Sequence, residues 1–406
     1  MVFSNFPTYK QIPGRPDITV SPVGVADGYI TNGGADFGPD TPGTTTSGIA
    51  EALNTGLPIS LLDGQYNITD SIPLPLVSRI RGTANAVGVG QVTTPTLKGT
   101  IIQGAPGKDV FQITQATTIF DIEGVSISWA SAETVGWGIN TTASSPHMIN
   151  SFFLDKVWVT NSTHSIQLIN AMYGKMGYVV GSSGIINLTE EDANNNYGNL
   201  TIDTLICNYC NINGTTHSLG ENLITINRIE VYPDSSTYGL YINNGGSIHI
   251  NSFNQGGTTY LNAIQLVGCD DIGFNQVSFG ANGASFDISN CKRIVVDAGL
   301  GYAPIFTVSP WGPGVITTRM IGGVNNQGFS MTTPAVPTSG TALQNTNPFS
   351  VRIYVLTASG VTYTITDPSG TTSPSITAAA GSEITLAPGA SITPTYTTLT
   401  WKWYGE

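Results

Sequence analysis

The sequence predicts an all-β protein built as a solenoid of stacked parallel coils, and three observations predict this class. Short runs in which apolar and polar residues alternate are separated by Gly, Asn and Ser clusters along most of the chain, which is the pattern of many short strands. Three of these runs align at one constant step. Only 10% of the 406 residues are charged, while 40% are hydrophobic, enough for a substantial core.

The constant step is the strongest sign of stacking. The step from Ile250 to Ile272 equals that from Ile272 to Ile294, and an alignment without gaps places all three in one column. Because neighbouring parallel strands lie about 4.8 Å apart, apolar residues held in register at a constant step predict that each coil stacks on the last. A chance alignment of short Ile-rich runs is the alternative. The aligned segments are 240–253, 262–275 and 284–297.

The charged residues of these segments fit the same stacking. Asp270-Asp271 is followed one coil later by Lys292-Arg293, so opposite charges stand side by side, whereas like charges would repel. In this register His249 lies beside Asp271. An adjacent Asp pair also fits a catalytic interpretation, but the ladder favours a structural salt-bridge step.

One helix precedes most of the strands. Ser47 is placed to act as the N-cap, Ile49 and Leu53 share a face, and Gly56 stands where a C′ glycine belongs. The sequence therefore predicts a helix over residues 47–55.

Composition divides the chain into four parts. The last part has longer alternating strands and two Pro/Gly turns, which are typical of a small β-sandwich-like module. Trp401 and Trp403 share one face of its final strand, so they form either the core of the module or an exposed platform, and we favour the core. The predicted parts are an N-terminal arm at 1–25, the stacked coils at 26–325, a linker at 326–348 and the C-terminal module at 349–406.

The segment 33–82 resembles the opening of the pectate-lyase-like right-handed parallel β-helix superfamily, especially its viral tailspike-type members. The family pattern is a Gly-Ala, Asp and Asp-Thr stretch, an amphipathic helix, a strand ending in Gly-x-Tyr, and a strand leading to a Gly-rich turn. Its places are filled here by Ala35, Asp36, Asp40, Thr41, Gly64, Tyr66 and Gly82. The resemblance spans about residues 30–105. It implies a right-handed parallel β-helix whose open end is capped by the helix, a homotrimer, and an N-terminal arm that contacts other virion proteins.

The resemblance identifies an architecture better than a reaction. The Gly-His-Gly and Arg-x-Lys motifs of polygalacturonase-type relatives do not occur in this sequence. No unambiguous set of acidic calcium ligands with a basic proton acceptor, as in lyase-type relatives, is recognisable either. No catalytic residue is therefore transferred, and we expect no metal and no cofactor.

The sharpest catalytic candidates lie in the earlier coils. An alignment of two similar strands, with an insertion between them, places Glu123 over Asp155, one coil apart. Two carboxylates at this spacing approach the separation of about 5–5.5 Å found in retaining glycosidases. Their repulsion raises one pKa, which makes that group a usable acid. Asp121 can face the same side. The alternative, which we favour, is that Glu123 pairs with a cation such as Lys156 or that the register differs.

Aromatic residues beside these strands are candidates for binding carbohydrate. Trp129 and Trp137 flank the carboxylate of Glu133 and its neighbour Thr134, and Trp158 points outward from the adjacent strand. Flat aromatic faces next to hydrogen-bonding groups suit the apolar faces and hydroxyls of sugars. The alternative is that these Trp side chains fold back onto the coil or are buried in a subunit contact.

The cysteines give no clear metal or redox signal. Cys207 and Cys210 lack a second pair or a nearby His set for zinc, so the metal signal is weak. Cys269 and Cys291, one coil apart, fit a disulfide or a stacked pair of buried thiols equally well.

Charge and processing signals bear on the location of the protein. The net charge of −12, with no Lys/Arg cluster, argues against nucleic acid as a partner. No apolar run is long enough for membrane insertion. The first residues show no secretion signal. Glycosylation sequons nevertheless occur, although an Asn- and Thr-rich chain also produces them by chance, at Asn67, Asn140, Asn161, Asn187, Asn199 and Asn213.

These observations predict a spike- or fibre-like structural protein, extracellular or on a virion surface, that recognises a host-surface polysaccharide or glycoprotein. An enzyme of the same architecture that cleaves the glycan by hydrolysis or elimination is the second hypothesis. An adhesin or surface-layer component of a cell is the third.

Overall fold

The computed structural model describes residues 17–23, 35–87, 96–142, 149–189, 199–214, 223–233, 237–257, 261–280, 284–297, 299–301, 305–309, 316–318, 329–330, 333–347 and 350–405. The chain forms two compact units, Met1–Thr216 with Glu221–Ile224 and His217–Gly220 with Thr225–Glu406. Both are built mainly of parallel β-coils, as the sequence predicts, so the fold is a parallel β-solenoid. Among the described residues, no helix has the length and apolar character needed to cross a membrane.

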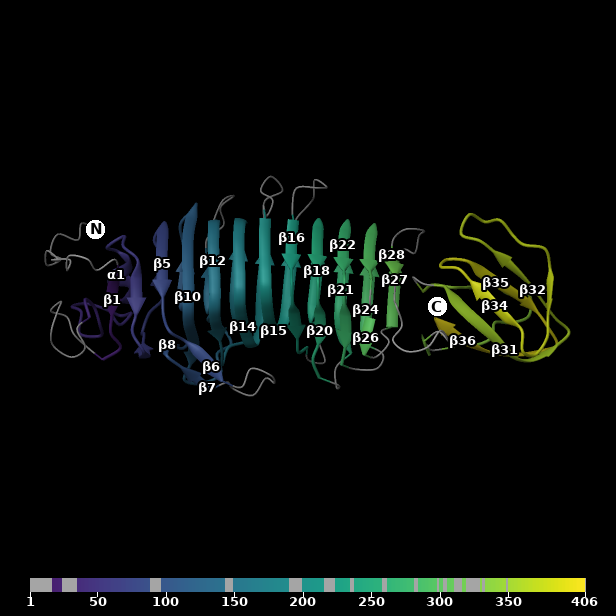
Figure 1. Ribbon diagram of the computed structural model, residues 1–406, viewed down its shortest axis with the longest axis horizontal. Coiled ribbons are helices and arrows are strands. Elements are labelled where there is room, and N and C mark those ends of the chain that lie inside the picture. The colour runs from purple at the N-terminus through teal and green to yellow at the C-terminus, as the bar shows by residue number, and fades with distance from the viewer. Residues whose placement is uncertain are drawn as a thin grey trace. The chain divides into compact units, whose positions relative to one another are not determined.

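The first unit is a stack of parallel strands (Figure 1). Its inner side chains form apolar columns. Ile122 pairs with Leu154 and Leu154 with Met176, and all three side chains are fully buried. Burying a side chain of this size contributes about 1.5–3 kcal/mol, so the columns hold the coils in register. The long strands of the stack are β5 (Val77–Arg81), β10 (Thr118–Trp129), β12 (Ile149–Val159), β14 (Ala171–Thr189) and β15 (Asn199–Asn213).

Shorter strands complete these coils, and one antiparallel hairpin, β6–β7, lies outside the parallel sheet. Their bounds are β1 (Ile18–Val20), β2 (Ile59–Leu61), β3 (Gly64–Asn67), β4 (Ile72–Pro73), β6 (Asn85–Val87), β7 (Thr96–Lys98), β8 (Thr100–Gly104), β9 (Phe111–Ile113), β11 (Ile139–Thr141) and β13 (His164–Ile169).

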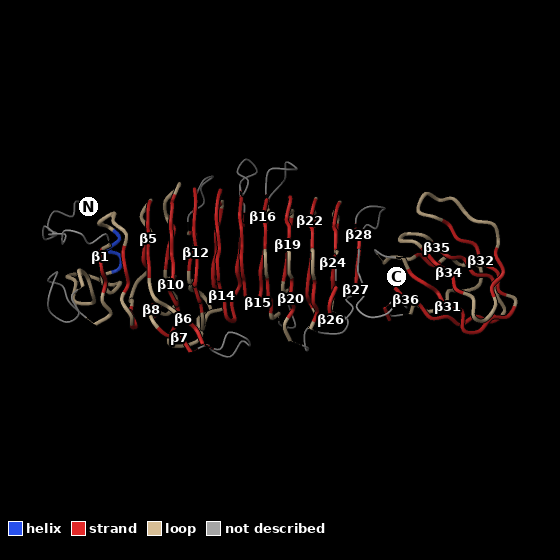
Figure 2. Tube along the Cα trace, in the orientation of Figure 1, coloured by secondary structure: helices blue, strands red, loops and turns tan. Residues whose placement is uncertain are grey.

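The helix forms as predicted but is shorter and begins differently. It is α1 (Ile49–Leu53), drawn in blue in Figure 2, and it contacts β1 and β4. Ser47 is not its N-cap: the N-cap is Gly48 at φ 83°, and the Ser47 hydroxyl donates to the carbonyl oxygen of Asn67 at 2.7 Å. Gly56 does take the left-handed conformation, at φ 73°. That α1 caps the open end of the core stays a prediction.

The coils after residue 222 confirm one predicted step and correct another. Ile272 pairs with Ile294, as predicted, but the preceding step is longer by two positions, so Ile248 pairs with Ile272 and Ile250 pairs with Phe274. The predicted column is therefore wrong in its first member. Because side chains alternate with a period of two, such a shift keeps the same side chains inside, and the solenoid persists. His249 accordingly pairs with Gly273, not with Asp271.

The strands of these coils are short. They are β16 (Leu223–Ile226), β17 (Ile229–Val231), β18 (Leu240–Asn243), β19 (Ser247–Ile250), β20 (Phe253–Gln255), β21 (Asn262–Val267), β22 (Asp271–Phe274), β23 (Val277–Phe279), β24 (Ser285–Ser289), β25 (Arg293–Val296), β26 (Gly299–Gly301), β27 (Ile305–Ser309) and β28 (Ile316–Thr318).

The predicted salt-bridge step is confirmed. Lys292 Nζ lies 2.9 Å from Asp270 Oδ1, and Arg293 Nη2 lies 3.4 Å from Asp271 Oδ2. The paired carboxylates are thus part of the ladder.

The two cysteines that precede these pairs are free, buried thiols. The backbone N–H of Cys269 points at Cys291 Sγ at 3.3 Å. Of the two alternatives for this pair, the structure has the stacked thiols.

The abundance of Asn and Gly has a structural cause at the corners of the coils. Asn244, Gly268 and Asn290 stand at equivalent corners with φ of 51°, 63° and 55°. Asn and Gly tolerate this left-handed conformation better than other residues. Two of these corners donate a backbone hydrogen bond to the next coil, from Asn244 to Val267 at 2.7 Å and from Gly268 to Ser289 at 2.8 Å.

The C-terminal module consists of two four-stranded antiparallel sheets. Trp401 and Trp403 are 6% and 0% exposed, and their ring centroids lie 5.8 Å apart, so they belong to the core of the module, as favoured from the sequence. The strands are β29 (Phe329–Ser330), β30 (Leu343–Gln344), β31 (Val351–Ser359), β32 (Val361–Thr366), β33 (Ile376–Ala378), β34 (Glu383–Leu386), β35 (Ser391–Thr395) and β36 (Thr398–Gly405).

Two predicted boundaries differ from the strand pairings. β1 lies in the segment predicted as an arm, yet it pairs with β2 in the parallel sheet. β29 and β30 lie in the segment predicted as a linker, yet they pair with β36 and β35 of the C-terminal module. Pro and turn residues marked both segments as irregular, but short edge strands tolerate such residues. Residues 1–16, most of the predicted arm, lie outside the described residues.

Candidate functional site

The predicted register between the two carboxylate-bearing strands is correct. Glu123 pairs with Asp155 between β10 and β12. Both strands bend directly afterwards, because Gly124 and Lys156 take left-handed conformations with φ of 66° and 51°. A lysine pays a steric cost for this conformation that a glycine does not. The bend therefore presents Lys156 at the surface, where it is exposed.

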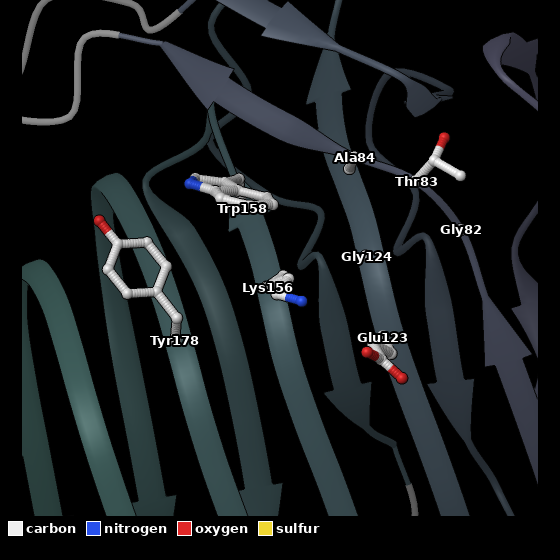
Figure 3. A pocket seen from close by; sticks show the side chains of 8 residues that line it. All are labelled: Gly82, Thr83, Ala84, Glu123, Gly124, Lys156, Trp158 and Tyr178. Carbon is white, nitrogen blue, oxygen red and sulfur yellow. The ribbon is translucent and has the colours of Figure 1, made fainter.

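A pocket of about 580 Å³ lies over this bend (Figure 3). Lys156 lies between Trp158 and Glu123 on the face of the coil, and Tyr178 lies beside Trp158. The wall of the pocket combines a cation, a carboxylate, hydroxyl groups and aromatic surface. The lining residues are Gly82, Thr83, Ala84, Glu123, Gly124, Lys156, Trp158 and Tyr178.

The three candidate carboxylates have different surroundings. In the described part of the chain, no hydrogen bond or ion pair engages the Glu123 carboxylate, so the pairing with Lys156 is not formed. Asp155 Oδ1 accepts the backbone N–H of Tyr178 at 2.9 Å, which gives Asp155 a structural role on the next coil. Asp121 Oδ2 lies 3.3 Å from Arg79 Nε, while its Oδ1 is buried without a hydrogen-bond partner.

The surroundings of Asp121 favour its protonated form. Burial raises the pKa of Asp121, Arg79 and Arg81 oppose the rise, and the charge of Glu123 adds to it. A carboxyl with a raised pKa is a candidate general acid. Its ion pair with Arg79, however, directs one oxygen away from this role.

Trp158 is not an open platform for sugar. It is 4% exposed and packs with Ala84 and Val180, and Leu97 of β7 lies against this cluster. The hairpin β6–β7 thus covers the outward face of Trp158. The indole Nε1 is buried with no hydrogen-bond partner, so only the edge that lines the pocket is available to a ligand.

The side chains of Trp129 and Glu133 also make their polar contacts within the fold. Trp129 is 3% exposed, and its Nε1 donates to the carbonyl oxygen of Ala105 at 3.2 Å. The Glu133 carboxylate accepts four backbone N–H groups, those of Thr134, Val135 and Gly136 at 2.8–3.1 Å and that of Gly107 at 2.8 Å. The predicted contact of Trp129 and Glu133 with carbohydrate is therefore replaced by structural roles in this loop.

Burial alone would raise the pKa of Glu133, but the four backbone donors outweigh it and lower the pKa. Glu133 is thus an ionised anchor of the loop.

Trp137 remains partly open to solvent. Its ring lies 4.6 Å from that of His164, at 44° between the ring planes. Its backbone N–H donates to Asp109 Oδ1 at 2.9 Å. Of the predicted aromatic residues, Trp137 therefore keeps a surface that a sugar can contact.

Sequence reasoning missed Thr83 and Tyr178, which line the pocket. Leu154 pairs with Met176, and Tyr178 follows two residues later. The step from Leu154 to Met176 equals the step from Ile272 to Ile294, so the same step applied to β12 would have aligned β14 and identified Tyr178. Thr83 has no such signal, because the chain reaches it from β5 through a turn. Within the described residues, no group of three or more His, Cys, Asp or Glu side chains is arranged to hold a metal ion.

The sequons fall into two groups. Asn67 and Asn199 are exposed, whereas Asn140, Asn161, Asn187 and Asn213 are half-buried. Asn140 and Asn187 bond neighbouring side chains, and the amide of Asn161 donates to the Trp129 carbonyl oxygen at 3.1 Å. Use of any sequon stays a prediction, which the exposed pair fits best.

Comparison with known proteins shows a likeness to a solved structure. No protein-family model matches the chain, and no curated protein matches it. The chain is similar to the enzymatically active domain of tailspike protein 4 of bacteriophage CBA120, with 12% sequence identity and a TM-score of 0.23. The match covers 90% of this chain and 66% of that one, so the chain spans just under two thirds of the structure that it matches. No site residue is transferred from it.

Proposed function

We propose that this protein is a spike- or fibre-type surface protein that binds a host-surface glycan on the lateral face of its solenoid. The pocket over Glu123 and Lys156 supports this proposal. Its volume of about 580 Å³ lies in the range of small-ligand sites, about 300–1,000 Å³. Aromatic surface beside several polar groups is the combination that binds sugar rings.

The charges around the pocket favour an acidic sugar. Lys156 is exposed, and no described ion pair involves it or Arg81, which directly precedes Gly82 of the pocket wall. Arg81 pairs in register with Glu123, which pairs with Asp155 beside Lys156, so the two cations lie on alternate coils with the Glu123 carboxylate between them. A sugar carboxylate pairs favourably with such cations.

Replacing Lys156 with Met should weaken binding of an acidic polysaccharide such as polygalacturonate by about 10- to 150-fold, because a charge-assisted hydrogen bond contributes about 1.5–3 kcal/mol. Isothermal titration with the full chain measures this change. Lys175→Met is the matched control, because Lys175 is exposed on the same unit but already pairs with Asp203 at 3.0 Å. Equal loss in both variants would show that the pocket is not the binding site.

The enzyme hypothesis has one specific observation in its favour. Glu123 and Asp155 stand on adjacent coils, and neighbouring strands lie about 4.8 Å apart, near the spacing of retaining glycosidases. In that case Glu123, which has no partner among the described residues, is the candidate acid or nucleophile, and Asp155 and Asp121 are its neighbours.

The double substitution Glu123→Gln with Asp155→Asn should abolish any release of new reducing ends or unsaturated uronates from the glycan. Asn at 155 keeps an oxygen for the Tyr178 N–H, so the fold is retained. Thermal denaturation of the variant checks this. Unchanged turnover would remove the catalytic proposal and leave the binding proposal intact.

The assembly of the protein belongs to the same proposal. Val77, Ile119, Ser151 and Tyr173 align on one outward column, and its three large side chains, Val77, Ile119 and Tyr173, are 63%, 37% and 50% exposed. An exposed apolar stripe of this kind fits a contact between subunits, so we assign it to the predicted homotrimer. Attachment to a virion through the N-terminal arm stays a prediction, and mass spectrometry of purified particles tests it.

A further inference from the structure

A second polar surface of the first unit is separate from the pocket. Five side-chain amides stand in one column on successive coils, and we name them the amide lane: Gln112, Asn140, Gln167, Asn187 and Asn211. All five are half-buried. Gln167 Nε2 donates to Asn140 Oδ1 at 3.0 Å, and Asn211 Nδ2 donates to Asn187 Oδ1 at 2.8 Å.

The single charge beside the lane, on Asp109, is held in place by hydrogen bonds. Asp109 Oδ2 accepts Gln112 Nε2 at 3.0 Å and Asn140 Nδ2 at 2.9 Å, while its Oδ1 accepts the backbone N–H of Trp137. The other members of the lane are uncharged. The lane therefore offers hydrogen bonds through uncharged amides, while the negative charge of Asp109 disfavours an anionic ligand.

Each amide has unused hydrogen-bonding capacity. A side-chain amide has two donor hydrogens and two acceptor lone pairs. A bond along the lane, such as that from Gln167 to Asn140, uses one donor and one acceptor. The remaining groups face outward at the strand spacing of about 4.8 Å, which forms a row of donors and acceptors along the solenoid.

Apolar surface borders this row. His164 and Ile185 are half-buried members of the neighbouring column, whose next member, Tyr209, is buried. Trp137 packs against His164, whose Nδ1 lies 3.1 Å from Thr163 Oγ1. A ring fixed by these contacts costs little entropy when a ligand stacks on it. The combination of a flat aromatic ring and a row of amides matches the two surfaces of a sugar chain.

We propose that the amide lane and Trp137 bind a neutral polysaccharide that lies extended along the coils. The uncharged amides and the negative charge of Asp109 favour an uncharged ligand over an anionic one, and the repetition over five coils selects a linear polymer over a compact molecule. This surface is distinct from the pocket at Lys156, so the proposal holds or fails independently of the acidic-sugar site.

Affinity electrophoresis of the full chain in gels that contain dextran, galactomannan or polygalacturonate tests the proposal. Trp137→Ala and Gln167→Ala should each weaken binding to at least one neutral polymer by about 5–20-fold, as expected for loss of a stacking contact or of hydrogen bonds. Their binding of polygalacturonate should not change. Lys156→Met should instead weaken binding of polygalacturonate and leave binding of the neutral polymers unchanged.

Asn251→Ala is the matched control, because Asn251 lies in a second amide ladder, between Asn227 at 2.8 Å and Asn275 at 2.7 Å. Its binding of neutral polymers should equal that of the unmodified chain. If Trp137→Ala and Gln167→Ala bind neutral polymers normally, or if no neutral polymer binds, the proposal is wrong. If these variants instead dissociate an oligomer in sedimentation, the lane is a contact with a second copy, and the proposal is also wrong.

Discussion

Replacing Glu133 with Ala is expected to lower the free energy of unfolding by about 4 kcal/mol. The carboxylate accepts four backbone N–H groups and is 7% exposed. Each buried donor left without an acceptor costs about 1–3 kcal/mol, reduced where water reaches it. Trp129 and Trp137 flank the loop, so intrinsic fluorescence during urea unfolding reports on it directly.

The pH dependence of this contribution has a defined sign. The folded state lowers the pKa of Glu133 below that of the unfolded chain, which is about 4.3. The stabilisation is therefore fully present above the unfolded pKa and is lost as the pH falls through the folded pKa. The difference in stability between the unmodified chain and Glu133→Ala should shrink in that acidic range.

Asp70→Asn is the control for a general charge effect. Asp70 pairs with Lys108 at 3.3 Å on the surface near the same loop, where an ion pair contributes about 0–1 kcal/mol. The stability of this variant should change by less than about 1 kcal/mol. An equal effect of the two substitutions would mean that Glu133 acts through its charge and not through the backbone groups that it binds.

The sequence predicted the stacking of coils because side-chain alternation is local. Glu123 was placed over Asp155 correctly, since the flanking apolar residues repeat in both strands. The uniform step failed at Ile250 because a coil longer by two positions leaves the alternation unchanged, so the hydrophobic pattern cannot distinguish the two registers.

The sequence could not predict which candidate side chains are taken up by contacts within the fold. Trp158 faces outward, as the sequence predicts, but the hairpin β6–β7, which comes from much earlier in the chain, covers it. Contacts of this separation leave no periodic signal. Glu133 was identified as a carboxylate between two Trp residues, yet backbone groups that no sequence pattern marks determine its role.

The register of the later coils leads to the second large prediction. Phe274→Ala should lower the free energy of unfolding by about 5 kcal/mol. Phe274 is fully buried, and its ring centroid lies 6.5 Å from that of Phe253 and 5.4 Å from that of Phe286. Truncating a buried Phe to Ala costs about 3–5 kcal/mol, and each aromatic pair adds about 0.5–1.5 kcal/mol.

The energetic coupling between pairs of substitutions distinguishes the observed register, in which Ile250 pairs with Phe274, from the uniform step predicted from the sequence. In the structure Ile250 stacks on Phe274, so Ile250→Val and Phe274→Leu should show an interaction energy of at least about 0.5 kcal/mol in a double-mutant cycle followed by urea unfolding. His249→Ala, an exposed neighbour opposite Gly273, should change stability by less than about 0.5 kcal/mol and should not couple with Asp271→Asn. The reverse result, with His249 coupled to Asp271 and Ile250 independent of Phe274, would return the coils to the uniform step predicted from the sequence. The two cycles distinguish the registers because a shift by two positions changes which side chains touch while it leaves every buried position buried.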